Sequence, residues 1–120
     1  MRFDTLSRFQ DIITAIDSLS HELEKHLEIY KCKISLIDGS NLRIFEKYDH
    51  EQLVYYSYYW LTAFNQLIIG WDCAPHHFAI DTFPYHKHVA SHTQVSSSMV
   101  RNLNDALMII KKGLLSRISD

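Results

Sequence analysis

An alternation of apolar and polar residues begins at Tyr30 and constrains the fold of this chain more than any other feature. The pattern sets Tyr30, Cys32, Ile34 and Leu36 against Lys31, Lys33 and Ser35. A period of two places alternate side chains on opposite faces of a strand. We therefore predict a half-buried β-strand, with its apolar side chains facing the core.

A hairpin is expected to follow this strand. The dipeptide Asp-Gly at 38–39 marks the turn, and the next strand places Leu42 and Ile44 on one face. For a shared apolar face, Ile34 should pair with Ile44. Leu36 should then pair with Leu42, which favours a three-residue or bulged turn.

The next segments rich in aromatic and β-branched residues extend the sheet. We predict a third strand at 53–61, a fourth at 66–72 and a short fifth strand at 85–89. The connections between these segments are short and polar. An antiparallel meander of four or five strands is therefore the simplest topology.

Helices are expected at both ends of the chain. In residues 4–27, apolar side chains recur at steps of three and four, and the last of them are Leu19, Leu23 and Leu27. A closing helix is expected over 98–116, with a stripe formed by Leu103, Leu107, Ile110 and Leu114. The sequence predicts one α+β domain over 1–120, a sheet flanked by an N-terminal and a C-terminal helix.

Composition narrows the class of protein. The 120 residues carry a formal net charge of −2, so nucleic-acid binding would need a local basic patch. Two cysteines do not make a disulfide scaffold. The chain starts without the apolar run of a signal peptide and lacks the roughly 20 apolar residues of a membrane helix. We therefore expect a cytoplasmic protein that does not enter the membrane.

Histidine is the anomaly of the composition. The chain has eight histidines, and His76, His77, His86, His88 and His92 fall within one short segment. An extended backbone at 85–89 would send His86 and His88 to the same side and Lys87 to the other. A loop between the two groups can bring the earlier histidines alongside the later ones. We expect a functional site in the segment from Trp71 to His92.

One interpretation of this segment is acid–base chemistry on a phosphodiester. Histidine titrates near neutral pH, so one imidazole can accept a proton while another donates one. A metal-free ribonuclease also needs a cation for the charge that develops on the phosphorane oxygens. The candidate catalytic residues are His76, His86, His88, Asp72 and Lys87. The candidate substrate-binding residues are Tyr56, Tyr58, Trp71 and His77.

Other interpretations remain open. His86 and His88 with His76 have ligand-like spacing for zinc or another divalent metal, whereas the acid–base interpretation needs no cofactor. The same histidines and aromatic residues could instead dock a protein partner without catalysis. A structural role is expected for His21, His26, His50, Cys32 and Trp60. The cations Lys31, Lys33, Arg43 and Lys47 are most simply a solvated sheet face, with a shallow phosphate-binding patch as the alternative.

Three blocks of this chain together resemble the signature blocks of the TumE family, toxins of bacterial toxin–antitoxin pairs. They are Tyr-Ser-Tyr-Tyr-Trp at 56–60, Trp-Asp-Cys-Ala-Pro-His-His at 71–77 and Phe-Pro-Tyr-His-Lys-His at 83–88. The resemblance covers roughly residues 28–115. It implies a toxin partnered by a helix-turn-helix antitoxin, and by analogy an RNA-directed activity. A homodimer is also compatible with it.

The chain departs from the family pattern at four positions. Tyr59 and Tyr85 stand where the family usually has histidine, Gly70 where it often has arginine, and Cys73 where it usually has asparagine. If the missing histidine or arginine takes part in the chemistry, this chain would be weakened, altered or inactive. The positions that the resemblance carries over are Asp72, His76, His77, His86, Lys87 and His88.

Overall fold

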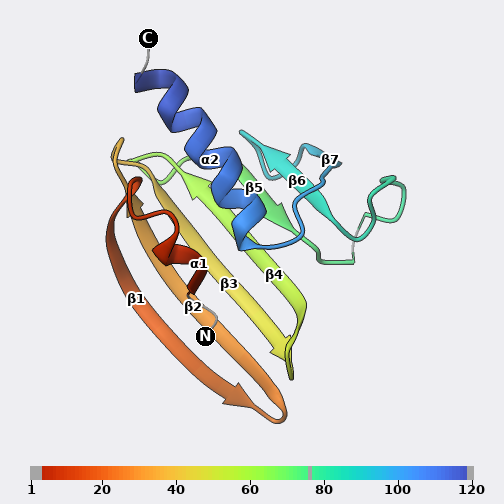
Figure 1. Ribbon diagram of the computed structural model, residues 1–120. Coiled ribbons are helices and arrows are strands. Elements are labelled where there is room, and N and C mark those ends of the chain that lie inside the picture. The colour runs from red at the N-terminus through yellow and green to blue at the C-terminus, as the bar shows by residue number, and fades with distance from the viewer. Residues whose placement is uncertain (1–3, 76, 119–120) are drawn as a thin grey trace.

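The computed structural model describes residues 4–75 and 77–118, which form two helices and seven strands (Figure 1). The elements in chain order are α1 (Asp4–Ser7), β1 (Ile13–Glu24), β2 (Leu27–Leu36), β3 (Asn41–Asp49), β4 (Gln52–Leu61), β5 (Leu67–Asp72), β6 (His86–Val89), β7 (Val95–Ser97) and α2 (Leu103–Ile118). The protein has an α+β fold.

The strands form one antiparallel sheet in the order β1 to β7, and each strand is bonded to its neighbours in sequence. The predicted meander is confirmed. The strands expected at 53–61, 66–72 and 85–89 correspond to β4, β5 and β6. The strand count was too low because β1 and β7 were not anticipated.

The N-terminal segment is the main correction. The prediction of a helix over 4–27 was wrong beyond Ser7, because residues 13–24 form the edge strand β1. The side chains of β1 are almost all exposed, so burial imposes no period of two on them. Pairing with β2 along most of its length, from Ile13 with Leu36 to Glu24 with Leu27, determines its conformation.

The β2–β3 hairpin also differs from its expected register. Ile34 pairs with Leu42, not with Ile44, and Cys32 takes Ile44 as its partner. The loop therefore spans four residues, 37–40. Gly39 has a φ of +89°, and the Ser40 amide donates to Asp38 Oδ1. The shift of two residues leaves the apolar side chains on one face, so the face assignment stands although the register was wrong.

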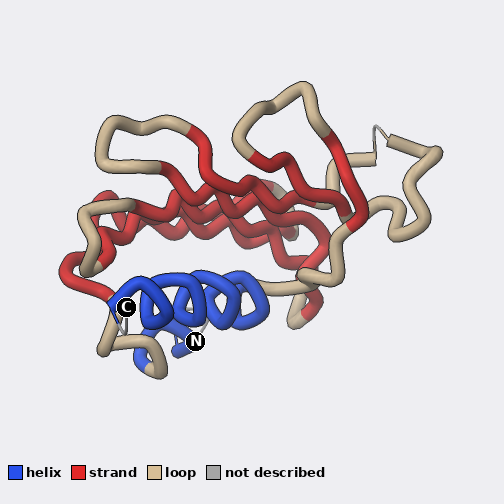
Figure 2. The backbone as a smooth tube through the Cα atoms, turned by 90° about the horizontal axis from the view of Figure 1, so that it is seen from above, coloured by secondary structure: helices blue, strands red, loops and turns tan. Residues whose placement is uncertain are grey.

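Helix α2 covers one face of the sheet and closes the core (Figure 2). Its predicted stripe, Leu103, Leu107, Ile110 and Leu114, is buried as expected. Cys32 and Trp60 are also buried in this core, and Trp60 Nε1 donates to Ser40 Oγ at 3.0 Å. Their structural assignment is therefore confirmed. Within the described residues, neither helix is both long and apolar enough to cross a membrane.

Helix α2 begins later than expected, at Leu103 rather than 98. Asn102 precedes the helix, and its Oδ1 accepts the Asp105 amide at 3.0 Å. Asp105 Oδ2 in turn accepts the Arg101 amide at 2.9 Å. These reciprocal bonds resemble a capping box and fix the start of the helix at this point. The serines at 96–98 lie in β7 and the connection after it.

Candidate active site

Strands β5 and β6 bring the predicted site together. Asp72 ends β5 and pairs with His86 at the start of β6, and Gly70 pairs with His88. Alternation along β6 directs His86 and His88 to the face opposite α2, and both are buried. The expectation that these two histidines share a side is therefore confirmed.

The Asp72 carboxylate contacts most of the other groups of the site. Its Oδ1 lies 2.7 Å from His86 Nε2 and accepts the Ala74 amide at 3.1 Å. Its Oδ2 accepts the Tyr59 hydroxyl at 3.0 Å and lies 3.5 Å from His88 Nε2. The carboxylate is only 5% exposed, so these neighbours take the place of water around it.

Both ring nitrogens of His86 lie close to oxygen atoms of the site. Its Nδ1 lies 3.0 Å from the carbonyl oxygen of Pro84, which can only accept a hydrogen bond. Its Nε2 faces the Asp72 carboxylate, which also accepts. A ring with a proton on each nitrogen would satisfy both contacts, and His86 and Asp72 form a close buried pair.

His88 is in the opposite situation. Its Nδ1 is buried and has no hydrogen-bond partner of standard geometry among the described residues. Burial lowers the pKa of His88 below its usual 6.5; the charge of Asp72 opposes this shift without reversing it. His88 is therefore a member of the cluster whose burial disfavours the protonated form.

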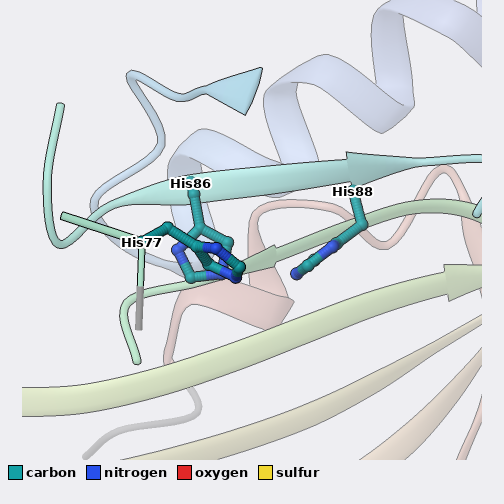
Figure 3. Close-up of side chains that lie close together, drawn as sticks. All are labelled: His77, His86 and His88. Atoms are coloured by element: carbon teal, nitrogen blue, oxygen red, sulfur yellow. The ribbon is translucent and has the colours of Figure 1, made fainter. Parts of the chain in front are cut away.

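His77 completes the group from the loop between β5 and β6 (Figure 3). Its ring centroid lies 4.7 Å from that of His86 and 6.1 Å from that of His88. His92, after β6, lies 6.0 Å from His88 and is exposed. His77 is partly exposed, so these two rings form the outer part of the cluster and His86 and His88 the inner part.

Three of the four rings also offer converging metal donors. His77, His86 and His88 each place one nitrogen so that all three lie within 4.8 Å of one another. A tetrahedral zinc ion with bonds of 2.0–2.1 Å needs ligand atoms about 3.4 Å apart, so the rings would have to close in further. His76, predicted as a ligand and a catalytic residue, lies outside the described residues.

Lys87 was expected to bind phosphate if the backbone turned it inward. It does not, because β6 directs it to the α2 side, where it lines a shallow groove with Trp71 and Asp105. No lysine therefore lies within the histidine cluster in the part of the chain that the structure describes.

The positions of Tyr56, Tyr58 and Trp71 do not fit the substrate-binding role expected of them. These side chains are at most 1% exposed, on the face covered by α2. The Tyr56 hydroxyl donates to the Val100 carbonyl at 2.6 Å, and the Tyr58 hydroxyl donates to Glu46 Oε2 at 2.5 Å. Their ring faces pack in the core, so none is available to a base.

The other histidines lie apart from the cluster, on the surface. His21 stacks on Tyr30 with ring centroids 4.3 Å apart, and both His26 and His50 lie beside Asp49. Their expected structural assignment agrees with these positions.

Cys73 is half-buried; its Sγ accepts the Tyr56 amide at 3.3 Å, and burial raises its thiol pKa. It therefore lacks the character of a nucleophile.

Sequence reasoning missed the part that Tyr59 and Gly70 play in the site. The two residues pair directly between β4 and β5. A Cβ at position 70 would lie 2.3 Å from Cδ1 of Tyr59, so the ring occupies the space of any side chain there. Burial, and then the charge of Asp72, raise the pKa of Tyr59, which keeps its hydroxyl protonated as a donor. Two of the positions that depart from the expected family pattern are thus in direct contact.

Comparison with protein families decides the affiliation. A family model described as Toxin TumE matches residues 3–114. The chain belongs to the TumE toxin family. Comparison with curated proteins and with solved structures found no significant match. TumE membership supports a role as the toxin component of a toxin–antitoxin system, with an antitoxin as partner.

Proposed function

We propose that this TumE toxin acts on RNA and cleaves its phosphodiester bonds by acid–base catalysis at the histidine cluster. The observation that carries the proposal is the 2.7 Å contact between Asp72 and His86, beside a neutral, buried His88. An acid and a base held together at neutral pH are what phosphodiester transfer requires. We further propose that the partner antitoxin is a helix-turn-helix protein and that the toxin acts in the cytoplasm.

In the proposed reaction, His88 takes the proton of a ribose 2′-hydroxyl, and the 2′-oxygen forms a bond to phosphorus. The bond from phosphorus to the 5′-oxygen breaks, and that oxygen takes the Nε2 proton of the His86 imidazolium, which leaves Asp72 as it is transferred. The products are a 2′,3′-cyclic phosphate and a 5′-hydroxyl. Asp72 orients His86, whose charge offsets the negative charge that develops on the phosphorane oxygens.

Access determines how the substrate would enter. His86 is 2% exposed and His88 is 7% exposed, so the phosphate would have to pass His77 and His92. An RNA duplex is too broad for such an approach, whereas an unpaired nucleotide can be splayed into it. The proposal therefore concerns single-stranded RNA.

Substitution of His86 tests this proposal. The variant His86→Gln removes the imidazolium, and we expect a loss of RNA cleavage of at least 100-fold, because a positioned acid or base typically contributes 10²–10⁴. The measurement is cleavage of a single-stranded RNA by the purified chain, alongside growth inhibition in cells.

The matched control is His50→Ala, since the His50 side chain is 86% exposed and outside the cluster. It should cleave like the unmodified chain. A folded His86→Gln variant, with an unchanged circular dichroism spectrum, that still cleaves RNA at the normal rate would contradict the proposal.

A second candidate function is metal-dependent hydrolysis, favoured by the convergence of nitrogens from His77, His86 and His88. A divalent ion on three imidazoles with an open position could activate water. Elemental analysis of the gently purified protein separates the two candidates. About one metal per chain, lost in His86→Gln, would favour the metal; sub-stoichiometric metal would count against it.

A further inference from the structure

The sheet face opposite α2 carries a group of basic side chains. In the part of the chain that the structure describes, no helix lies on this face over β2 and β3 (Figure 2). It presents Lys31, Lys33, Arg43 and Lys47, which are exposed or half-buried. These are four of the twelve Lys and Arg residues of a chain whose net charge is −2. They form a local patch that the overall charge does not reveal.

The register of the strands joins this patch to the histidine cluster. Residues paired across antiparallel strands share a face, so the pairing defines rows that cross the sheet. One row consists of Lys31, Phe45, Ser57, Asp72 and His86; the next consists of Lys33, Arg43, Tyr59, Gly70 and His88. The distance from β2 to β6 is four strand spacings, or roughly 19 Å.

The charges of the patch are not neutralised by neighbouring acids. Among the described residues, none of the four cations is within ion-pair distance of a carboxylate, although Asp17 pairs with Lys33 across the strands. Arg43 instead donates from Nε to the amide oxygen of Asn41 at 3.0 Å. The patch therefore retains its positive charge for a ligand.

Phe45 lies in the middle of the patch. The amines of Lys31 and Lys47 lie 5.6 and 5.8 Å from the centroid of its ring, which is half-buried. An aromatic ring between cations is the arrangement by which proteins hold single-stranded nucleic acid, with the base stacked on the ring and the phosphates on the amines. The alternative of an acidic protein partner would not require an aromatic ring there.

We propose that this patch, formed by Lys31, Lys33, Arg43, Lys47 and Phe45, binds the backbone of single-stranded RNA and guides it to the histidine cluster. The proposal rests on the function proposed above and names its substrate path. The rows of paired residues run from the patch to His86 and His88. An RNA strand that lies along these rows would therefore place at the cluster a phosphate that is one or more nucleotides distant from those held by the patch.

The test is RNA binding over a series of salt concentrations. The probe is a fluorescent single-stranded RNA of about 12 nucleotides, 2′-O-methylated so that no 2′-hydroxyl can react. The double variant Lys31→Ala/Lys33→Ala should bind more weakly. Its slope of log affinity against log salt should be shallower by about 1.4, because each phosphate contact on a single strand contributes about 0.7.

Two further variants sharpen the test. Phe45→Leu should weaken binding roughly fivefold or more and leave the salt slope unchanged, since stacking is not electrostatic. Lys112→Ala, an exposed lysine on α2, is the matched control and should change neither value. If Lys31→Ala/Lys33→Ala had the same RNA affinity and the same salt slope as Lys112→Ala, the proposal that the patch binds RNA would be wrong.

Cleavage of unmethylated RNA, followed in parallel, separates this proposal from the proposed function. Binding that depends on the patch, without cleavage by the unmodified chain, supports the patch and contradicts the nuclease. Cleavage without patch-dependent binding supports the nuclease and overturns the patch. Loss of antitoxin binding alone in the double variant would make the patch a protein-docking surface and also overturn the proposal.

Discussion

At the scale of single residues, the site depends on how Asp72 is held. Its carboxylate oxygens face two imidazoles, a phenol and a backbone amide, all supplied by β4, β6 or the turn after β5. Four neighbours around one buried charge stabilise it without water. Tyr59 belongs to this arrangement, although the resemblance led us to expect a histidine in its place.

Gly70 is the residue that allows Tyr59 to reach Asp72. We expect Gly70→Ala to lower the free energy of unfolding by about 1–3 kcal/mol, because the added methyl group would overlap the Tyr59 ring. The penalty should largely disappear in a Tyr59→Ala background. Urea unfolding of the four proteins of this cycle measures both values.

The control for that cycle is Gly113→Ala. A Cβ at Gly113 would lie 3.6 Å from Trp60, which is ordinary contact, and alanine is the better helix former. This variant should be as stable as the original chain or more stable. If Gly70→Ala behaved in the same way, the coupling between Tyr59 and Gly70 would be wrong.

The lowered pKa of His88 predicts a pH dependence of stability. As the pH falls below 6.5, the unfolded chain protonates His88 before the folded chain does. The unfolded state then holds more protons, so the contribution of His88 to stability falls from pH 6.5 down to its folded pKa, and above pH 6.5 it is constant. We expect His88→Gln to reduce the loss of stability between pH 7.5 and about 5.5.

Chemical denaturation at the two pH values measures this effect, with His50→Ala as the control for a surface histidine. His50→Ala should keep the full pH dependence. A His88→Gln variant with the same or a steeper loss of stability would show that His88 is not held neutral by burial.

Among the secondary-structure elements, α2 begins at a side-chain cap whose contribution to stability can be measured by substitution. Asn102→Ala removes the oxygen that accepts the Asp105 amide, and we expect it to lower the free energy of unfolding by about 1 kcal/mol. Thermal unfolding measures the difference. Asn102→Asp, which keeps a capping oxygen, should retain most of the stability, and an equal loss in both variants would argue against the cap.

The strands that bury one face could be predicted from the sequence. A strand whose two faces are both exposed could not. The alternation at 30–36 and the aromatic segments gave β2, β4 and β5, because burial imposes the period of two. Strand β1 has exposed Ile16, Leu19 and Leu23, whose spacing also fits a helix. Only its pairing with β2 determines its conformation. The spacing of apolar residues within the segment carries no information about this partner strand.

The same limit applies to the site. His86 and His88 were placed on one side by alternation, and Asp72 was named beside them, because all three lie on strands. Tyr56 and Tyr58 were assigned to the substrate although they alternate with the residues that face the cluster. The pairing of Tyr59 with Gly70 and of Asp72 with His86 would have identified the correct face, but it required the register of three strands.

In the molecule as a whole, the two faces of the sheet differ in their role: one packs the core and the other carries the candidate site. One face, covered by α2, holds the core and the tyrosines that stabilise it. The other face carries the histidine cluster over β5 and β6 and the basic patch over β2 and β3. This division accounts for how a chain of slight negative charge can still present a cationic surface, which we propose as the path for RNA.

The end groups of cleaved RNA show whether the histidine cluster cleaves phosphodiester bonds by metal-free acid–base catalysis. The purified chain is incubated with single-stranded RNA in excess EDTA, and the new ends are identified. We expect cleavage that leaves 2′,3′-cyclic phosphate and 5′-hydroxyl ends and is blocked by 2′-O-methylation. Intact RNA in EDTA, with cleavage restored by a divalent metal and 5′-phosphate ends, would contradict this expectation.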